Sequence, residues 1–259
     1  MPYVQTSGAR IHYELTGPDS APVVVLSSSL GTHADMWWPQ VPALAGRFRV
    51  LRYDMRGHGA SEVSPGPYSI ADLGRDVLDM LDQLGLERVA FCGLSLGGMI
   101  GMWLGANAAQ RIDRLILCNT SPYMGGPEAW NARIELVTRE GMAALADSIL
   151  ERWFTARFRQ ASPAVVERVR QMLLSTPPAG YAACCAAVRD MDLRPQVPTI
   201  IAPTLVVGGK HDPSTPMEQV RSIAAQISGA KLVELDAAHL SNIEAERDFT
   251  AAVLEFLQG

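Results

Sequence analysis

Short apolar runs alternate along this chain with longer segments in which hydrophobic residues recur at helical spacing. The apolar runs predict strands at Ile11–Leu15, Val23–Leu26, Arg49–Tyr53, Val89–Cys92, Leu115–Asn119, Thr204–Val207 and Leu232–Leu235. The helical pattern predicts helices that include Ile70–Leu84, Leu96–Ala109, Met217–Ile227 and Asn242–Leu257. Because strands that alternate with helices pair in parallel, this pattern predicts an α/β fold: a mostly parallel sheet with helices on both faces.

The alternation stops between Tyr123 and Arg194. This stretch keeps helical periodicity but contains no strand pattern. A helical insert late in an α/β chain favours a cap over the carboxyl ends of the strands, where such sheets bind ligands. We therefore expect a core in two parts, residues 1–122 and 195–259, with a helical cap at residues 123–194. A cap of this kind excludes water and shapes substrate choice.

A glycine-rich segment lies between a predicted strand and a predicted helix. It reads Gly93-Leu94-Ser95-Leu96-Gly97. A chain that turns from strand to helix within a few residues forces its apex residue into a strained backbone conformation, and glycines fit two positions to either side. The helix N-terminus then offers free N–H groups to a developing negative charge. The pattern predicts a nucleophile elbow with Ser95 as the nucleophile.

A nucleophilic serine needs a histidine as general base and a carboxylate that orients the histidine. Asp212 lies on a loop just beyond the strand Thr204–Val207 and its glycine stop. His239 follows the strand Leu232–Leu235 in the same way. Since the carboxyl ends of parallel strands share one edge of the sheet, we expect Ser95, Asp212 and His239 to form a catalytic triad there.

Other histidines and acids hold weaker positions for these roles. The competing histidines are His12 in an N-terminal strand, His33 and His58 in loops before the elbow, and His211 beside the acid. The competing acids are Asp190, Asp192 and Asp236, and none of them directly follows a predicted strand with a glycine stop. We interpret the segment that holds Arg56 and His58 as structural, because it forms the turn after its strand.

Composition narrows the class of protein. The chain has 259 residues, of which 48% are hydrophobic, and this length is typical of one large core. Its net charge of −5 and its lack of a basic run argue against nucleic-acid or anionic-membrane partners. We see no leader pattern and no apolar stretch long enough to cross a bilayer, so we expect a cytoplasmic protein. The sequence leaves the oligomeric state open.

The four cysteines and the acidic residues indicate no bound cofactor. Cys92 and Cys118 fall in predicted buried strands, and Cys184 and Cys185 lie in an alanine-rich helix, so we interpret all four as packing residues without disulfides. Zinc-ligand spacing, an acidic ligand cluster and a dinucleotide fingerprint are all missing from the sequence. We therefore expect no metal, nucleotide or flavin, and a small molecule as the substrate.

The chain resembles the α/β-hydrolase superfamily over nearly its whole length, through the elbow, the segment Asp54–Ser61 and the loops of Asp212 and His239. Within that superfamily it is most similar to 3-oxoadipate enol-lactonases. This resemblance is carried by Ser29–Thr32, Arg52–Gly59, Phe91–Met99, Cys118–Thr120, Gly180–Tyr181 and His239–Glu244. Most of these are fold motifs, and the more specific ones are Cys118-Asn119-Thr120, the cap and Ser241-Asn242-Ile243-Glu244.

An oxyanion hole of this fold combines two backbone N–H groups, one of them from the residue after the nucleophile, here Leu96. The second comes from the loop after the strand Val23–Leu26. Related hydrolases usually carry His-Gly ahead of that donor, and counting back from Trp37 places two serines there and Leu30 at the donor. A serine-rich turn can supply a backbone donor provided that Gly31 permits the course of the loop.

The resemblance implies a serine hydrolase that opens 3-oxoadipate enol-lactone to 3-oxoadipate through an acyl-enzyme, in protocatechuate and catechol catabolism. That γ-lactone bears a carboxymethyl group, and a carboxylate in an apolar pocket needs a cation. Arg133 follows Trp130 by one helical turn. We expect Arg133 to bind the carboxylate and Trp130 to wall the ring. Arg152 is the alternative, with Arg133 then a solvated arginine of the cap.

Other functions remain compatible with the sequence. The same triad would serve a general carboxylesterase, a cofactor-free perhydrolase or a carbon–carbon bond hydrolase. A dehalogenase or epoxide hydrolase is disfavoured, because each needs Asp where Ser95 stands. A small-molecule receptor that retains the fold is the alternative outside the enzymes, and the complete set of Ser95, Asp212 and His239 argues against it.

Overall fold

The computed structural model describes residues 2–259, and its strands form one eight-stranded sheet in the order β1-β2-β4-β3-β5-β6-β7-β8. The strands are β1 (Tyr3–Gln5), β2 (Arg10–Thr16), β3 (Val23–Ser27), β4 (Arg49–Tyr53), β5 (Val89–Leu94), β6 (Ile112–Cys118), β7 (Thr204–Gly209) and β8 (Lys231–Leu235). The β1–β2 and β2–β4 pairs are antiparallel, and every other pair is parallel. The prediction of a mostly parallel sheet is confirmed.

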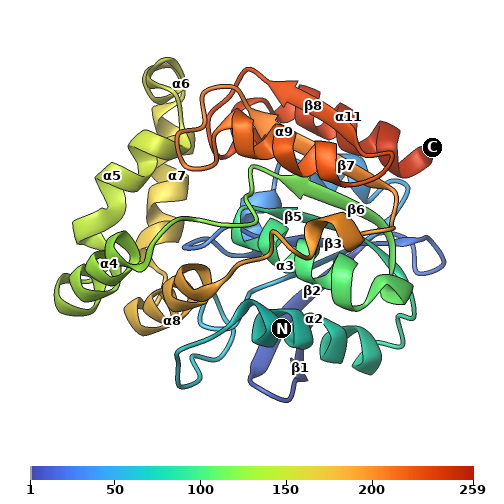
Figure 1. The fold of residues 1–259 in the computed structure, drawn as a ribbon, viewed down its shortest axis with the longest axis horizontal. Helices are drawn as coiled ribbons and strands as arrows, with labels where there is room; N and C mark the ends of the chain where they lie inside the picture. Colours follow the sequence, from blue (N-terminus) through green and yellow to red (C-terminus); the bar gives the residue numbers. More distant parts are fainter. Residues whose placement is uncertain (1) are drawn as a thin grey trace.

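Helices cover both faces of this sheet (Figure 1). Those outside residues 123–194 are α1 (Val41–Leu44), α2 (Ile70–Gln83), α3 (Leu96–Asn107), α9 (Met217–Gln226), α10 (Ser241–Glu244) and α11 (Glu246–Gln258). Short 3-10 helices lie at η1 (Ala34–Trp37), η2 (Ala109–Arg111) and η3 (Val197–Thr199). Helix α3 packs directly on the central strands β5 and β6, which are buried along most of their length.

Residues 123–194, which we call the helical insert, lie to one side of the sheet (Figure 1, yellow-green to gold). The insert contains α4 (Pro127–Glu140), α5 (Ala143–Trp153), α6 (Ala156–Ala161), α7 (Pro163–Leu174) and α8 (Pro178–Asp190). Helix α4 packs against α8 and α5 packs against α7, and the buried apolar residues of these helices include Val137, Ile149, Val169 and Leu173. As predicted, the insert holds no strand.

The sequence pattern was wrong about one helix and missed one strand. It predicted a single helix over Asn242–Leu257, whereas Ala245, with φ −113° and ψ 46°, separates α10 from α11. Polar contacts fix the orientation of α10 independently of α11, because the Asn242 amide donates to Met36 O at 3.1 Å and Glu244 accepts from the Ala238 N–H at 2.9 Å. Strand β1 is too short to give a recognisable alternation.

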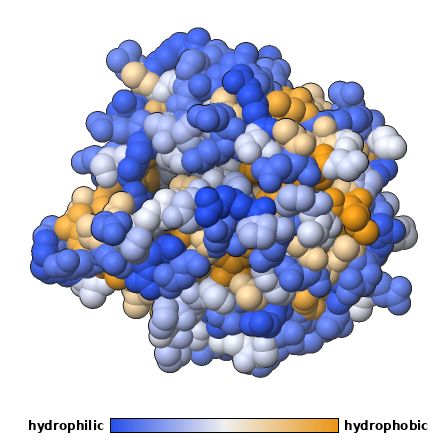
Figure 2. Space-filling view, viewed as in Figure 1, coloured by the Kyte–Doolittle hydropathy of each residue, from blue (hydrophilic) through white to orange (hydrophobic). Residues whose placement is uncertain are grey.

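The surface and the cysteines agree with a globular domain. On the face drawn in Figure 2, hydrophobic residues form separate small areas among hydrophilic ones. All four cysteines are buried and free, which confirms their interpretation as packing residues. In residues 2–259, no helix is long and apolar enough to span a bilayer.

Candidate active site

Ser95 stands at the junction between β5 and α3. Its backbone has φ 58° and ψ −115°, a conformation that side-chain-bearing residues rarely adopt and that costs strain energy. Its amide donates to Cys118 O at 2.9 Å, and its carbonyl accepts from Thr120 Oγ1 at 2.8 Å. These two contacts with the end of β6 hold the strained residue in place.

The glycines on either side of Ser95 allow the tight turn. A Cβ on Gly93 would lie 2.1 Å from the carbonyl oxygen of Gly97, and a Cβ on Gly97 would lie 2.2 Å from that of Ser27. Both neighbours are backbone atoms, so a side chain at either position would push β3, β5 and α3 apart. The structure therefore places Ser95 in the strand–turn–helix context that the sequence predicted.

Asp212 and His239 come together on the loops that follow β7 and β8. His239 Nδ1 lies 2.7 Å from Asp212 Oδ2, and both side chains are buried. Asp212 Oδ1 accepts the backbone N–H groups of Ser214 and Thr215, at 2.7 and 3.1 Å, and Oδ2 accepts the Thr215 hydroxyl at 2.6 Å. These contacts fix the carboxylate and, through it, the orientation of the imidazole.

The environment of Asp212 keeps its carboxyl ionised. Burial by itself raises the pKa of this group, but nearby His239 and the hydrogen bonds from His239, Thr215 and Asn119 outweigh burial, so the pKa lies below its usual value. An ionised Asp212 accepts a hydrogen bond from the Nδ1–H of His239, which leaves the lone pair of Nε2 free to act as a base.

Two positioning residues of this site escaped the sequence reasoning. Asn119 follows β6 with φ 43°, and its amide donates to Asp212 Oδ2 at 3.0 Å and to Ala238 O at 3.2 Å. The Ser241 hydroxyl in turn donates to Asn119 Oδ1 at 2.5 Å. The sequence signal for them is in Cys118-Asn119-Thr120 and Ser241-Asn242-Ile243-Glu244, the two segments that also carry the family resemblance.

The rival histidines and acids make other contacts. His12 pairs with buried Asp54 at 2.9 Å, His33 accepts the N–H of Asp35 at the start of η1, and exposed His211 pairs with Asp236 at 2.7 Å. Asp190 pairs with Arg189 and Asp192 with Arg194. In residues 2–259, Asp212 is the one acid in contact with His239.

The two backbone donors proposed for the oxyanion hole are both free. The N–H groups of Leu30 and Leu96 have no hydrogen-bond acceptor among the described residues. The loop that carries Leu30 is tied to the elbow, because the N–H of Gly97 donates to Ser28 O at 3.0 Å. Gly31 takes a φ of 82°, a conformation that glycine adopts readily, and so permits the course of this loop.

A cavity of about 380 Å³ lies between the elbow and the helical insert. Its lining includes Ser29, Leu30, Ser95, Pro213, Ser214 and His239 from the core, and Met124, Ala129, Trp130, Arg133, Ile149, Arg152, Trp153 and Tyr181 from the insert. Ser95 and His239 face this common space without a direct hydrogen bond within the described chain. Catalytic contacts of this kind often form only as substrate binds.

Two arginines bring positive charge to the insert side of the cavity. Arg133 donates to the Tyr181 hydroxyl at 3.2 Å, and its guanidinium lies 5.2 Å from the centre of the Trp130 ring. Burial lowers the pKa of Arg152, and Arg133 lowers it further, so the two cations repel each other. Neither arginine pairs with a carboxylate in residues 2–259. The arrangement suits an anionic group on a ligand.

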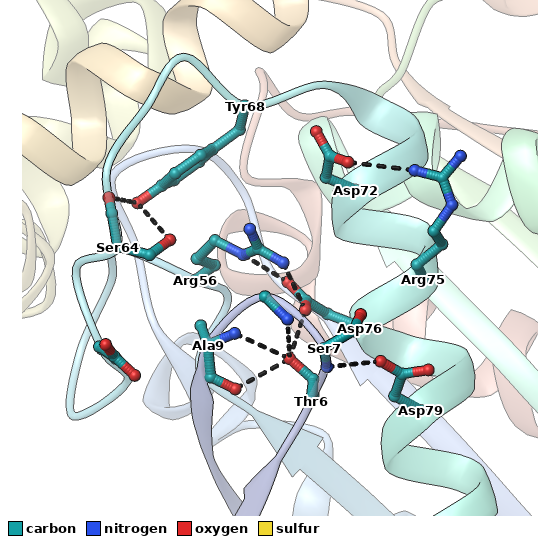
Figure 3. Close-up of polar contacts among 12 residues, drawn as sticks. Thr6, Ser7, Ala9, Arg56, Ser64, Tyr68, Asp72, Arg75, Asp76 and Asp79 are labelled. Atoms are coloured by element: carbon teal, nitrogen blue, oxygen red, sulfur yellow. Dashed lines mark hydrogen bonds and ion pairs between the residues drawn. The ribbon is translucent and has the colours of Figure 1, made fainter.

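Arg56 has the structural role that the sequence indicated. Its guanidinium makes two hydrogen bonds to the buried carboxylate of Asp76 on α2, at 2.6 and 2.8 Å (Figure 3). The Thr6 hydroxyl donates to the same carboxylate at 2.6 Å and links it to the turn before β2. No group of three or more His, Cys, Asp or Glu side chains in residues 2–259 could hold a metal ion.

The chain is similar to known hydrolases over nearly its whole length. A family model described as alpha/beta hydrolase fold matches residues 22–246. The chain is 38% identical to 3-oxoadipate enol-lactonase 2 of Acinetobacter baylyi, over 94% of this chain and 91% of that protein.

Solved structures give the same result. The enol-lactonase from Burkholderia xenovorans LB400 shares 48% identity, with a TM-score of 0.98 over 100% of both chains. A hydrolase from Pseudomonas aeruginosa PA01 also shares 48% identity, with a TM-score of 0.97 over 100% of this chain and 98% of that one. The elbow, the parallel sheet and these matches together show that the chain belongs to the α/β-hydrolase family.

Proposed function

We propose that this protein is a serine hydrolase that opens the ring of 3-oxoadipate enol-lactone to give 3-oxoadipate, in the catabolism of aromatic compounds. One observation carries the proposal: Ser95 and His239, which pairs with Asp212, line the same cavity as Arg133 and Arg152. A small lactone with a carboxylate needs a nucleophile and a cation at two ends of one pocket. Relatives named as enol-lactonases support the same substrate.

The reaction begins with proton transfer from Ser95 to His239. As the proton moves from Oγ to Nε2, Oγ attacks the lactone carbonyl, and Asp212 stabilises the imidazolium that forms. The N–H groups of Leu30 and Leu96 stabilise the negative charge on the former carbonyl oxygen. The tetrahedral intermediate then breaks its bond to the ring oxygen, which leaves as an enol after taking the proton from His239.

The second half of the reaction regenerates Ser95. The released enol remains part of the acyl chain and tautomerises to the ketone. Water gives a proton to His239 and attacks the acyl-enzyme carbonyl, and the bond between that carbonyl and Oγ breaks as His239 returns the proton to Ser95. The product is the linear diacid, so one water is consumed for each lactone opened.

Arg133 and Arg152 are proposed to hold the carboxymethyl group of the substrate. A guanidinium matches a carboxylate with two parallel hydrogen bonds, and a cavity of about 380 Å³ falls in the range of small-molecule sites. Trp130 lies beside Arg133 and would wall the lactone ring. The sequence offered these arginines as alternatives, and their common position on the cavity supports their acting as a pair.

The helical insert is proposed to act as the cap of this site, with the core at residues 1–122 and 195–259. Its residues supply the apolar and cationic wall of the cavity, and Leu240 beside the base donates its N–H to Trp153 O at 3.1 Å. This contact joins the cap to the loop of His239. A cytoplasmic location and a lack of nucleic-acid partners stay predictions.

A matched pair of substrates tests the proposed function. The wild-type enzyme is assayed with the enol-lactone and with the methyl ester of its carboxymethyl group, which keeps the lactone ring but removes the charge. We expect a higher kcat/KM for the charged lactone, with 3-oxoadipate as the product found by chromatography. A preference for the methyl ester, or turnover of simple acetate esters alone, would contradict the assignment.

A further inference from the structure

His58 spans the gap between the turn after β4 and the loop that carries Leu30. Its side chain is fully buried, and its Nε2 accepts the backbone N–H of Gly31 at 3.0 Å. Its Nδ1 lies 3.3 Å from the carbonyl oxygen of Arg56. Because Nε2 accepts the Gly31 N–H, it must carry a lone pair. The proton of the neutral ring therefore sits on Nδ1 and points to Arg56 O.

The surroundings of His58 keep the ring neutral. Burial lowers its pKa to about 4, and His33 lowers it too, while the Arg56 carbonyl and the Asp54 carboxylate act in the opposite direction. The cap contributes the Cys184 thiol, whose Sγ is 4.0 Å from Nδ1. At neutral pH, His58 is therefore an uncharged acceptor for Gly31.

The partner of Nδ1 is itself firmly held. The guanidinium of Arg56 is fixed by the buried carboxylate of Asp76, and Figure 3 shows this pair. The backbone of Arg56 therefore has little freedom to turn its carbonyl away from His58. This contact selects the tautomer of His58, as a second hydrogen bond does for many functional histidines.

Gly31 is held on its other side by the cap. Its carbonyl accepts from the Thr176 hydroxyl at 3.1 Å, in the segment between α7 and α8. One glycine is thus tied to the core through its N–H and to the cap through its carbonyl. Leu30, which carries the proposed oxyanion donor, immediately precedes it, so these two contacts fix the backbone on the carboxyl side of Leu30.

We propose that His58 is a positioning residue for the oxyanion hole: by accepting the Gly31 N–H, it aims the Leu30 N–H at the substrate oxygen. This inference rests on the proposed roles of Ser95 and Leu30 and goes beyond them. It changes the interpretation of the Asp54–Ser61 segment, because His58 then acts on the chemistry through the neighbouring loop. The backbone donor itself cannot be removed by substitution, whereas the side chain that aims it can.

Two amide variants separate this role from simple packing. In His58→Gln, Oε1 can take the place of Nε2 and accept from Gly31, whereas in His58→Asn the shorter side chain reaches only the position of Nδ1. His33→Asn is the matched control, because His33 lies in the same part of the fold without contacting Gly31. Each variant is assayed with the enol-lactone, and its melting temperature is measured.

His58→Asn should lower kcat by up to about 100-fold, the effect of losing one oxyanion donor, with KM nearly unchanged. Affinity for phenylboronic acid, which forms a tetrahedral adduct with Ser95, should fall in parallel, whereas inhibition by adipate should not change. His58→Gln and His33→Asn should keep most of the activity. Equal losses in the Gln and Asn variants, or losses that follow the melting temperature alone, would overturn the proposal.

Two further measurements keep the test decisive. If the Asn variant does not fold, ¹⁵N chemical shifts of the wild-type histidines report the tautomer directly, and a proton on Nε2 of His58 would overturn the proposal. Ser95→Ala separates a failure of the proposed mechanism from a failure of the role proposed for His58. Activity in Ser95→Ala would reject the proposed mechanism, whereas an inactive Ser95→Ala with an unaffected His58→Asn would reject only the role of His58.

Discussion

Replacing Arg133 by methionine should impair hydrolysis of the enol-lactone far more than hydrolysis of its methyl ester. The Arg133 guanidinium donates to the Tyr181 hydroxyl at 3.2 Å and lies 5.2 Å from the centre of the Trp130 ring. Neither neighbour is negatively charged, so the positive charge of Arg133 is available to the carboxylate of a substrate. Methionine keeps much of the apolar stem and removes only the charge and the donors.

The size of the effect follows from the hydrogen bond that Arg133 is proposed to donate to the substrate carboxylate. A hydrogen bond to a charged group contributes about 1.5–3 kcal/mol, which corresponds to roughly a 10- to 150-fold change in kcat/KM. Arg152 should moderate the loss, because its guanidinium lines the same cavity and is then free of the repulsion from Arg133. The remaining guanidinium then binds the carboxylate alone, and the double variant should show non-additive losses.

The assay compares kcat/KM for the lactone and its methyl ester in wild type, Arg133→Met, Arg152→Met and the double variant. Arg139→Met is the matched control on the same helix, since Arg139 is exposed and paired with Glu140. Equal losses on both substrates would refute the pairing and leave Arg133 with a packing role. Unchanged kinetics in both single variants would refute the cationic site as a whole.

Three further predictions concern the support of the site. Asn119→Gly keeps the left-handed backbone but removes a donor to Asp212. In steady-state assays, kcat should therefore fall by about 10-fold or more, and a rate equal to wild type would contradict this role. Mild acid should leave the support from Asp212 intact. Because the pKa of Asp212 is lowered, its stabilising effect is present above the usual carboxyl pKa and should be lost only as pH falls through the lowered value, and circular dichroism that shows unfolding already above the usual carboxyl pKa would argue against this. Arg56→Met leaves the buried Asp76 carboxylate unpaired and should lower the free energy of unfolding by about 3–5 kcal/mol in urea titrations, and a loss under 1 kcal/mol would show that the pair is dispensable.

The elbow position of Ser95 and the pairing of Asp212 with His239 could be predicted from sequence, because each of these residues has a local signal. Ser95 lies between a strand and a helix within a few residues of two glycines, and that pattern is contained in a single segment. Asp212 and His239 each follow a strand, and parallel strands bring their carboxyl ends to one edge whatever the details of packing. The positions of Asp212 and His239 after parallel strands are therefore enough to predict that the two residues lie close together, without knowledge of their tertiary contacts.

The positioning contacts could not be predicted in the same way. Ser241 meets Asn119 across 122 residues of sequence, and no periodic pattern records such a pairing. The break at Ala245 depends on the contacts of α10 with distant segments, which override a continuous helical pattern. The position of His58 after a strand predicts a structural turn, and the sequence does not reveal its contact with Gly31, which lies 27 residues away on another loop.

The most direct test of the central claim is the kcat of Ser95→Ala, His239→Ala and the double variant with the enol-lactone. If Ser95 and His239 act as one unit, each single variant should lose roughly 10⁶-fold, and the double variant should be no slower than either single one. Circular dichroism would show that all three keep the fold. Substantial turnover by Ser95→Ala, or losses that multiply in the double variant, would contradict the account.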